Sequence, residues 1–328
     1  MSEHNINRIG VLTSGGDAPG MNAAIRAVVR TASFLDLHAY GIMRGYAGLI
    51  EGEIKRLEKS TVGNIIHRGG TILKTARSDA FRTKEGRQKA FDSLMAHDID
   101  ALIVIGGDGT FTGANVFAEE FNIPIIGVPG TIDNDLYGTD LTIGFDTAVN
   151  TAMETVDRIR DTADAHSRLF FIEVMGRHSG FIALYTGIGS GAGSIMIPEK
   201  SYDIDSVART LRKGVRRQKL FNLIIVAEGN TTGNAFEVAN KVKDLVDNAE
   251  VKVSVIGHAQ RGGAPTAMDR LLASRLGYGA VNALLEGQSR AMIGVLNNQI
   301  TFTPFIDAIS KPKVPNEDLI RMAEILSL

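Results

Sequence analysis

The chain has 328 residues, no cysteine and a formal charge of −2, with 35 basic against 37 acidic side chains. Its length predicts about two domains, and 44% hydrophobic with 22% charged residues excludes a disordered or collagen-like protein. The lack of cysteine excludes disulfides, thiol catalysis and thiolate metal sites, and the near-neutral charge argues against nucleic acid as a partner.

The chain begins with polar residues, and its apolar runs, such as residues 101–105, are too short to span a bilayer. We therefore expect a cytoplasmic protein without a membrane partner. Any anionic ligand must be bound by locally placed groups, because the overall charge attracts none.

Glycines follow short apolar runs at residues 15–16, 106–107, 127 and 257. Glycine at the carboxyl end of a strand lets the backbone turn sharply and approach a ligand closely. This pattern predicts strands that end in tight, ligand-binding loops.

Strand and helix patterns alternate along the chain. Apolar residues recur with helical spacing over residues 114–121 and 149–156, and nearly continuous apolar runs are typical of parallel strands covered on both faces. The alternation predicts an α/β fold with a domain boundary near Phe145, where a loop-rich stretch gives way to a long helix. We expect strands at residues 101–105, 123–128, 169–174, 223–227 and 251–256.

Two glycine-rich loops could bind phosphate. Residues 13–20 read Thr-Ser-Gly-Gly-Asp-Ala-Pro-Gly before an apolar helix, and backbone amides at a helix start favour an anion. Taken alone, such a loop is more often a plain turn. The second loop, Gly-Gly-Asp-Gly-Thr at 106–110, adds Asp108, a carboxylate suited to Mg²⁺ held beside phosphates.

A third loop, Pro-Gly-Thr-Ile-Asp-Asn-Asp at 129–135, follows another strand. Asp133 could accept a proton from an attacking hydroxyl, which phosphoryl transfer requires. The same string in isolation would be a solvated turn, but carboxyl ends of strands are where open α/β sheets bind ligands.

Cationic side chains that could neutralise a transferred phosphoryl group adjoin glycines or strand ends. The guanidinium fork matches phosphate oxygens, although each arginine alone is more often a surface charge. Glu228, at the end of an apolar run, could bind a sugar hydroxyl or cap a helix. The candidate cations are Arg77, Arg82, Arg168, Arg177, His258 and Arg261.

Two other patterns do not support a function. Residues 187–193 resemble a dinucleotide fingerprint, but they precede an expected strand at 194–197 instead of following one. A dehydrogenase is therefore disfavoured. No Gly-Lys-Ser/Thr occurs, so the common P-loop is absent.

With residues 13–20, 106–110, 129–135, 175–177 and 258–263 in this order, the chain resembles the bacterial ATP-dependent 6-phosphofructokinases over nearly its whole length. The resemblance implies a magnesium-dependent, allosteric glycolytic kinase. It would transfer the γ-phosphoryl of ATP to the 1-hydroxyl of fructose 6-phosphate. It also implies a homotetramer with active sites shared between subunits.

The family's fold would comprise two three-layer α/β/α domains with mainly parallel sheets and the active site in the cleft between them. By resemblance, the ATP-binding domain covers residues 1–144 and about 260–310. The sugar-phosphate domain covers residues 145–259 and about 311–328.

The resemblance also assigns roles to residues of this chain. Asp133 would be the base, assisted by Thr131 and Asp135, and Asp108 would organise Mg²⁺. Arg77 and Arg177 would steady the moving phosphoryl group. ATP would meet Gly15, Tyr46, Arg77, Gly107, Asp108, Gly109 and Thr110. The sugar phosphate would meet Thr131, Ile132, Asp133, Met175, Gly176, Arg177, Glu228, His258 and Arg261, with Arg168 and Lys252 of a neighbouring subunit.

The choice of phosphoryl donor depends on Gly109 and Gly130, where related pyrophosphate-using enzymes typically have Asp and Lys. Glycine at both positions leaves space for ATP and favours it as the donor. The alternative is a pyrophosphate-dependent or differently specific sugar-phosphate kinase on the same fold. A catalytically silent nucleotide-binding subunit is disfavoured, because Asp108 and Asp133 are both present.

The chain departs from the family pattern at three positions. Lys252 stands where relatives usually have arginine. An ammonium group binds phosphate as a point charge, whereas the guanidinium group binds it through two parallel hydrogen bonds, so sugar-phosphate binding is expected to weaken. Gly193 and Ser60 replace a glutamate and a tyrosine of the effector site, which predicts weakened regulation by ADP and phosphoenolpyruvate. The effector residues that match are Arg26, Arg30, Arg160 and Lys219.

Overall fold

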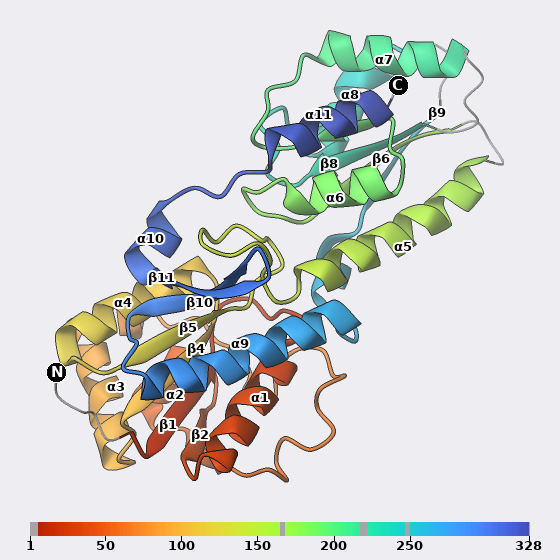
Figure 1. Cartoon of the computed structure of the whole chain (residues 1–328). Coiled ribbons are helices and arrows are strands. Elements are labelled where there is room, and N and C mark those ends of the chain that lie inside the picture. Colours follow the sequence, from red (N-terminus) through yellow and green to blue (C-terminus); the bar gives the residue numbers. More distant parts are fainter. Residues whose placement is uncertain (1–5, 165–167, 217–221, 247–249, 328) are drawn as a thin grey trace. The chain divides into compact units, whose positions relative to one another are not determined.

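The computed structural model describes residues 6–164, 168–216, 222–246 and 250–327 (Figure 1). Its contacts divide the chain into two compact units. Unit 1 comprises residues 1–131, 136–146 and 261–312, and unit 2 comprises residues 132–135, 147–260 and 313–328. The chain therefore passes from one unit to the other several times, including at the third loop predicted to bind ligand.

Unit 1 contains a seven-stranded sheet in the order β11-β10-β5-β4-β1-β2-β3. Its five central strands run parallel, whereas β3 and β11 are antiparallel to their neighbours at the two edges. The strands are β1 Arg8–Thr13, β2 His38–Ile42, β3 Ile54–Leu57, β4 Ala101–Gly106, β5 Ile125–Pro129, β10 Ala291–Leu296 and β11 Gln299–Pro304.

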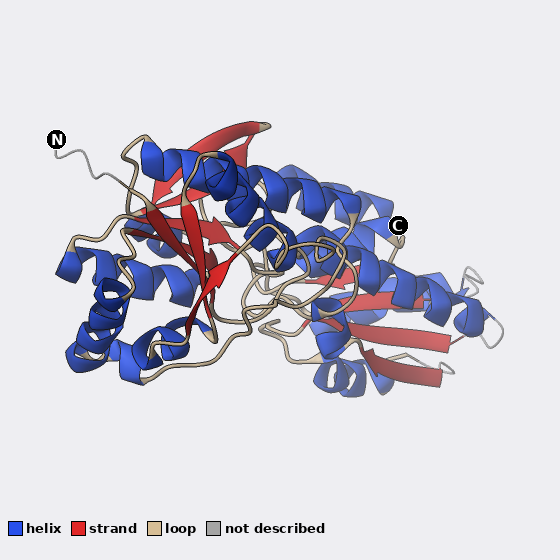
Figure 2. Cartoon of the chain, turned by 90° about the horizontal axis from the view of Figure 1, so that it is seen from below, coloured by secondary structure: helices blue, strands red, loops and turns tan. Residues whose placement is uncertain are grey.

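Helices cover both faces of this sheet (Figure 2). The helices α1 and α9 pack against each other and against one face. A continuous core joins the other face to α2, α3, α4 and α10, with every residue of β4 buried. The helices are α1 Met21–Phe34, α2 Gly45–Glu51, α3 Lys84–Ala96, α4 Asp108–Phe121, α9 Ala267–Leu285 and α10 Phe305–Ser310, with a 3₁₀ turn at Ala80–Arg82.

Unit 2 contains a four-stranded parallel sheet in the order β7-β8-β6-β9. Its core joins one face of the sheet to α7 and α8, and α6 packs against β8 and α11. The strands are β6 Arg168–Val174, β7 Ser194–Met196, β8 Asn222–Ala227 and β9 Glu250–Val255. The helices are α5 Phe145–Asp164, which begins in unit 1, α6 Phe181–Gly189, α7 Ile204–Arg216, α8 Ala235–Lys243 and α11 Glu317–Leu326, with a 3₁₀ turn at Gly257–Arg261.

The predicted α/β class and mainly parallel sheets are confirmed. The strand expected from residue 123 begins at Ile125, because Pro124 has no amide hydrogen and restricts the residue before it. The glycine string at 187–193 spans the end of α6 and precedes β7, as expected for a connection that is not a dinucleotide fingerprint. Among the described helices, none is both long and apolar enough to cross a membrane.

Candidate functional site

The first glycine-rich loop of unit 1 connects β1 to α1. Gly15 and Gly20 have φ angles of 83° and 111°, in the left-handed region that side chains disfavour. The amide of Ser14 donates to the carbonyl of Ile105 at 3.0 Å, which fixes the loop against the end of β4. An added Cβ on Gly16 would lie 1.9 Å from Nη1 of Arg261. The guanidinium of Arg261 therefore lies against this loop, within the same unit.

The second loop turns directly into α4. Gly107 precedes the helix without a side-chain cap, so amides of the first turn are left for a ligand or water. The Thr110 hydroxyl donates to the carbonyl of Ser14 at 3.1 Å, which ties the second loop to the first. The amide of Gly130 donates to Gly106 at 3.0 Å, and a Cβ on Gly107 would lie 3.7 Å from Cβ of Thr131. Three predicted loops thus converge at the carboxyl ends of β1, β4 and β5.

This arrangement suits a polyphosphate with its metal ion. Helix α4 has 14 residues, and its start presents amides and the positive end of the helix dipole to an anion. Asp108 is exposed in the first turn. A single carboxylate together with phosphate oxygens and water is a common Mg²⁺ environment. The described residues contain no cluster of three or more acidic or histidine side chains that could hold a metal alone.

Tyr46 supports the second loop from within the core. Its hydroxyl donates to the carbonyl of Thr110 at 2.6 Å, and its ring stacks on Phe81 at 4.0 Å. Burial raises the pKa of Tyr46 above its ordinary value, so the phenol stays protonated and remains a donor. Arg87 holds the Phe81 turn by donating to the carbonyls of Phe81 and Arg82 at 3.1 and 2.7 Å.

Arg77 is exposed in a segment without regular secondary structure. The Thr13 hydroxyl donates to the carbonyl of Lys74 at 2.9 Å, which attaches this segment to the end of β1. Arg82 is also exposed and pairs with Asp79 at 3.7 Å. The segment that carries Arg77 is therefore attached to the same end of the unit 1 sheet as the glycine loops.

Unit 2 carries a second group of predicted site residues, on tight turns after β6 and β8. Gly176 has a φ of 142° and Arg177 a φ of 54°, a left-handed conformation that is uncommon for a side chain of this size. The Arg177 amide donates to Oε1 of Glu228 at 2.7 Å. A Cβ on Gly229 would lie 1.8 Å from the Arg177 carbonyl oxygen. The two turns are therefore in close contact.

The residues 132–135 belong to the same unit. Asp133 is 7% exposed and Ile132 is 1% exposed, whereas Asp135 is half-buried. Ser179, which is buried, donates from its hydroxyl to the carbonyl of Asp133 at 3.0 Å. Its amide donates to the carbonyl of Gly176 at 2.8 Å. The structure thus brings Asp133, Met175, Gly176, Arg177 and Glu228 together.

The molecule belongs to a known family. A family model described as phosphofructokinase matches residues 8–284. The chain belongs to the phosphofructokinase family. It is 55% identical over 323 residues to ATP-dependent 6-phosphofructokinase 1 of Thermus thermophilus, covering 98% of this chain and 100% of that protein. It is 53% identical over 320 residues to ATP-dependent 6-phosphofructokinase 2 of Bacteroides thetaiotaomicron, covering 98% of both.

Solved structures give the same result. The phosphofructokinase of Saccharomyces cerevisiae matches with a TM-score of 0.90 and 37% identity, over 98% of this chain and 48% of that chain. This chain therefore spans about half of the yeast chain. A pyrophosphate-dependent phosphofructokinase from Marinobacter aquaeolei, 23% identical, matches with a TM-score of 0.82 over 98% of this chain and 91% of that chain. At that identity the likeness shows the phosphofructokinase fold alone.

Three further predicted sugar-phosphate residues lie on β9, in the turn after it and at the start of β6. Lys252 is exposed on the edge strand β9 and pairs with Glu250 at 2.6 Å. His258 is exposed in the 3₁₀ turn after β9. Arg168 begins β6 beside Glu250 in the register of the sheet, and its side chain lies outside the described residues. Their roles, like those of the other predicted site residues, stay predictions.

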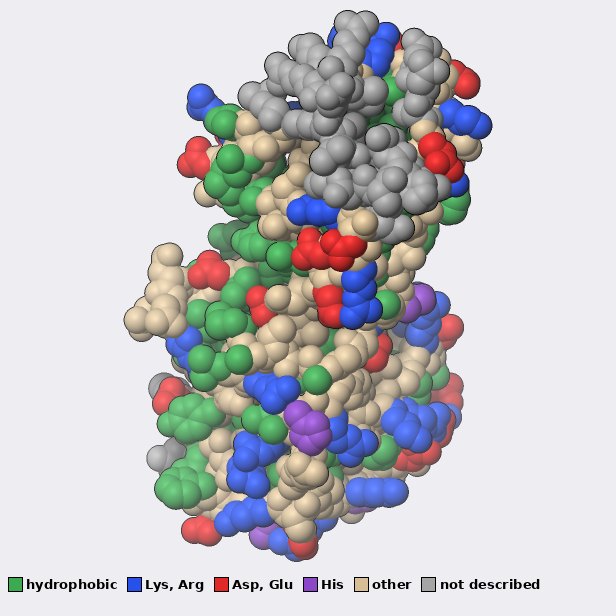
Figure 3. Space-filling model, turned by 90° about the vertical axis from the view of Figure 1, so that its right-hand side faces the viewer, with side chains coloured by type: hydrophobic (Ala, Val, Ile, Leu, Met, Phe, Trp, Pro, Cys, Tyr) green, Lys and Arg blue, Asp and Glu red, His purple; other side chains and the backbone are tan. Residues whose placement is uncertain are grey.

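The predicted effector residues occupy both units. Burial lowers the pKa of Arg26 below its ordinary value, and the nearby charge of Arg30, one turn further along α1, lowers it further. Two like charges this close would be stabilised by an anion. Lys and Arg side chains gather on the face of unit 1 shown in Figure 3. Arg160 lies on α5, Gly193 precedes β7, Ser60 is exposed and Lys219 lies outside the described residues.

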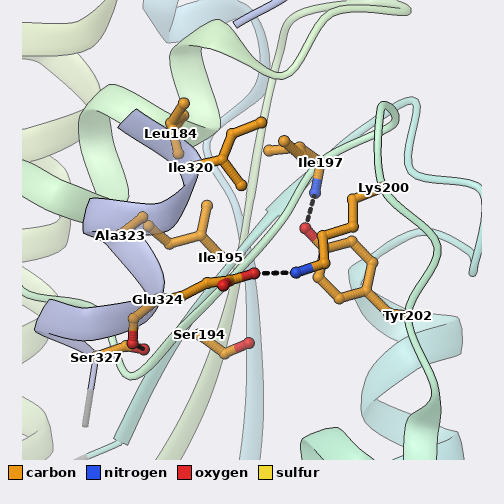
Figure 4. Close-up of a pocket in the computed structure, with 10 residues that line it drawn as sticks. All are labelled: Leu184, Ser194, Ile195, Ile197, Lys200, Tyr202, Ile320, Ala323, Glu324 and Ser327. Carbon is orange, nitrogen blue, oxygen red and sulfur yellow. Dashed lines mark hydrogen bonds and ion pairs between the residues drawn. The ribbon is translucent and has the colours of Figure 1, made fainter. Parts of the chain in front are cut away.

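A separate hollow of about 90 Å³ lies in unit 2 beneath α11 (Figure 4). Aliphatic side chains from α6, β7 and α11 line it, and an ion pair between Lys200 and Glu324 lies at its side. None of the predicted site residues lines this hollow. Its lining is mainly aliphatic and its lysine is paired with Glu324, so we do not assign the reaction to it.

The sequence analysis missed two contacts to the Asp133 turn. Ser179 donates to Asp133, as described above, and Nζ of Lys313 donates to Oδ1 of Asn134 at 2.8 Å. Lys313 is separated from Asn134 by 179 residues. No sequence pattern predicts these contacts. Ser179 merely follows the turn that carries Arg177, and Lys313 merely precedes the last helix. The fold alone brings them to the site.

Proposed function

We propose that the chain is an ATP-dependent 6-phosphofructokinase. It transfers the γ-phosphoryl of ATP to the 1-hydroxyl of fructose 6-phosphate and yields fructose 1,6-bisphosphate and ADP. Family membership and 50 to 55% identity to bacterial proteins that carry this name support the activity. The structural observation that carries it is the buried Asp133 turn, hydrogen bonded through Ser179 to the turn that carries Arg177.

In the proposed mechanism, unit 1 binds the nucleotide. Amides of the Gly15 loop and of the Gly107–Thr110 turn bind phosphate oxygens, and Tyr46 fixes the second loop through Thr110. The carboxylate of Asp108 would hold Mg²⁺, and the bound ion would neutralise charge on the transferred group. Arg77 contributes a further positive charge to the phosphate chain.

Unit 2 binds and activates the acceptor. Asp133 accepts the proton of the sugar's 1-hydroxyl while the oxygen of that hydroxyl forms a bond to the γ-phosphorus. The bond from the γ-phosphorus to the oxygen that bridges it to the β-phosphorus breaks, and that oxygen leaves with ADP. Thr131 and Asp135 assist from either side of this turn. Arg177 neutralises charge on the moving phosphoryl group. Ile132, Met175, Gly176, Glu228 and His258 of unit 2 hold the sugar, and Arg261 of unit 1 binds it further.

The choice of donor is explained by space at the second loop. A Cβ on Gly109 would meet nothing within 4 Å, so the protein itself does not require glycine there. A Cβ on Gly130 would lie 3.0 Å from Ile105 and from Met21, which leaves little room for a larger side chain. Open space beside Gly109 supports a bulky nucleotide donor over pyrophosphate.

Five finer proposals accompany the activity. Mg²⁺ is the metal cofactor, and the enzyme works in the cytoplasm as a step of glycolysis. It assembles as a homotetramer in which Arg168 and Lys252 reach a neighbouring subunit's sugar phosphate. Regulation by ADP and phosphoenolpyruvate is weak, because Gly193 offers no carboxylate for an activator's metal ion. The domains of the sequence analysis, one for ATP and one for sugar phosphate, remain part of this proposal.

A coupled assay with fructose 6-phosphate tests the function directly. ATP with Mg²⁺ is expected to give turnover that pyrophosphate does not, and a chelator is expected to abolish it. Asp133→Asn, which keeps the shape of the side chain but not its basicity, is expected to lower kcat by about 10³-fold, the middle of the range for a general base. Comparable rates with pyrophosphate would overturn the donor proposal, and full activity of the variant would overturn the base.

A further inference from the structure

Ser179 connects two turns of unit 2, and a third is bound to one of them through Arg177. Its amide closes the Gly176 turn at 2.8 Å, and its hydroxyl donates to the carbonyl of Asp133 at 3.0 Å. The intervening Arg177 is bound to Glu228 through its amide at 2.7 Å. Ser179 is 4% exposed, so water competes little for this hydroxyl. One buried side chain therefore connects the turn of the proposed base to the turn of the proposed phosphoryl-binding arginine.

Lys313 holds the next residue of the same turn. Asn134 is 1% exposed and has a φ of 52°, a left-handed conformation that must be held in place by its surroundings. Nζ of Lys313 donates to Oδ1 of Asn134 at 2.8 Å and lies 5.2 Å from the ring centre of Phe181, at the start of α6. The Asp133–Asn134 turn is therefore held by two hydrogen bonds, one to the carbonyl of Asp133 and one to the side chain of Asn134.

The segment that carries Lys313 is itself anchored. The following helix, α11, packs on α6, and its Ala323 is buried. An ion pair joins Glu324 of α11 to Lys200 (Figure 4). Ile320 faces the hollow beside Leu184 of α6 (Figure 4). Lys313 thus lies four residues before a packed helix, so its hydrogen bond can restrain Asn134.

We propose that Ser179 and Lys313 are positioning residues of the phosphoryl transfer, acting through the Asp133–Asn134 turn to aim the Asp133 carboxylate at the acceptor hydroxyl. This inference rests on the proposed function, in which Asp133 is the base. Neither residue touches the reacting atoms in this scheme. Their effect arises because a general base must lie within hydrogen-bond reach of its proton, and a displacement of about 1 Å can cost about 100-fold in rate.

Ser190 provides a matched control for Ser179. It is also a buried serine of unit 2, 3% exposed, at the end of α6. Its hydroxyl donates to Gly187 at 3.4 Å, three residues earlier in the chain. Loss of this hydroxyl removes a buried polar group without touching the Asp133 turn. Any general cost of losing a buried serine hydroxyl should therefore appear in both variants.

The first experiment compares Ser179→Ala, Lys313→Met and Ser190→Ala in the full-length protein. For Ser179→Ala and Lys313→Met we expect kcat to fall about ten-fold, within the range for a misplaced catalytic group, while KM for ATP and for fructose 6-phosphate changes less than about two-fold. Ser190→Ala should keep the wild-type kcat. An unchanged kcat in Ser179→Ala would overturn the proposal for Ser179, and a rise in KM alone would assign it a binding role instead.

Conservative variants separate positioning from folding. Ser179→Thr and Lys313→Arg keep the donor and are expected to recover kcat to within about three-fold of wild type, as retention of the hydrogen bond requires. If Ser179→Ala does not fold, the Lys313 pair decides the result. Wild-type kcat in Lys313→Met, at wild-type thermal stability, would then overturn the proposal.

A double-mutant cycle distinguishes this inference from the function on which it rests. In an Asp133→Asn background, Ser179→Ala should lower the residual kcat no further, because residues that act through one group are not additive. A further ten-fold loss in that background would overturn the positioning role and leave Asp133 as the base. Wild-type activity of Asp133→Asn itself would overturn the proposed base and, with it, the inference.

Discussion

The two units build their parts of the candidate site by different means. Unit 1 uses glycine loops and the start of α4, where backbone amides do the binding and few side chains are needed. Unit 2 uses side chains, the buried Ser179 and the exposed Glu228 among them, to hold turns in which Arg177 and Asn134 are left-handed. Contacts between residues far apart in the sequence fix the loops of both units, such as Thr110 to Ser14 in unit 1 and Ser179 to Asp133 in unit 2. The groups held in place are mainly backbone amides in unit 1 and side chains in unit 2.

This difference predicts where the molecule is most sensitive to small changes. In unit 1, a methyl group added at Gly16 meets the flexible end of Arg261, one added at Gly107 makes only an ordinary contact, and one added at Gly109 meets open space. In unit 2, a methyl group added at Gly229 meets backbone. Substitutions in unit 2 should therefore impair both stability and turnover, and substitutions in unit 1 should mainly affect ligand binding.

The largest effect is expected for Gly229→Ala. Its Cβ would lie 1.8 Å from the Arg177 carbonyl oxygen and 3.3 Å from Cα of His178, so the Arg177 turn must move. We expect about 2 kcal/mol lower stability, as for other overpacked sites, and kcat lower by about 100-fold. Urea unfolding and steady-state kinetics measure both, with Ser190→Ala as the control in the same unit. Wild-type kcat would show that the Arg177 turn does not set the rate.

A smaller and different effect is expected for Gly16→Ala in unit 1. Its Cβ would lie 1.9 Å from Nη1 of Arg261, at the flexible end of a long side chain that can move aside. We expect wild-type stability and KM for fructose 6-phosphate raised about ten-fold, the worth of one charge-assisted hydrogen bond. Arg261→Ala should have a similar effect, and the double variant should be no worse than the single ones. If the double variant lost the sum of the two single losses in binding, Gly16 would not act through Arg261.

Tyr46→Phe tests support of the second loop from within the unit 1 core. The variant loses the 2.6 Å hydrogen bond to the carbonyl of Thr110 but keeps the stack on Phe81. We expect KM for ATP to rise about five-fold, from loss of one buried hydrogen bond. Because burial raises the pKa of Tyr46, the difference should persist from neutral to mildly alkaline pH.

Tyr202→Phe is the control for this substitution. Its hydroxyl accepts from the amide of Ile197 at 3.1 Å in unit 2 (Figure 4), and burial raises its pKa to about 12. KM for ATP should not change in this variant. An equal rise in both variants would mean that the Tyr46 hydroxyl has no specific role in the nucleotide loop.

The same difference explains what the sequence could predict. The loops of unit 1 carry glycines next to apolar strands, and the parallel strands, the α/β class and the family follow from them. The role of Asp133 could also be predicted, because the residues of its loop are contiguous in the sequence. Ser179 and Lys313 could not, because their partners lie 46 and 179 residues away, and nothing local to a serine or lysine encodes a distant carbonyl. The left-handed Arg177 was equally hidden, since no glycine marks it.

The smallest expected effect concerns the outer support of unit 1. Arg87 donates to both carboxylate oxygens of Glu120, at 2.5 and 2.7 Å, besides holding the Phe81 turn. This hydrogen bond lowers the pKa of Glu120 below its ordinary value of 4.5. The pair therefore contributes its full stability above pH 4.5 and loses it as the pH falls through the lowered pKa of the folded state.

Glu120→Gln should accordingly be less stable than wild type at pH 7 by about 0.5 kcal/mol, since solvent screens a pair at the surface. The difference should shrink as the pH is lowered below 4.5, because the wild-type carboxylate then becomes protonated as well. Urea unfolding at a series of pH values measures it, with Glu85→Gln on the same unit as the control. Glu85 pairs with Lys89 at 2.8 Å but is 80% exposed, so no measurable change is expected there. A difference for Glu120→Gln that stays constant down to the lowest pH at which the protein is folded would mean that packing, and not charge, holds the Phe81 turn.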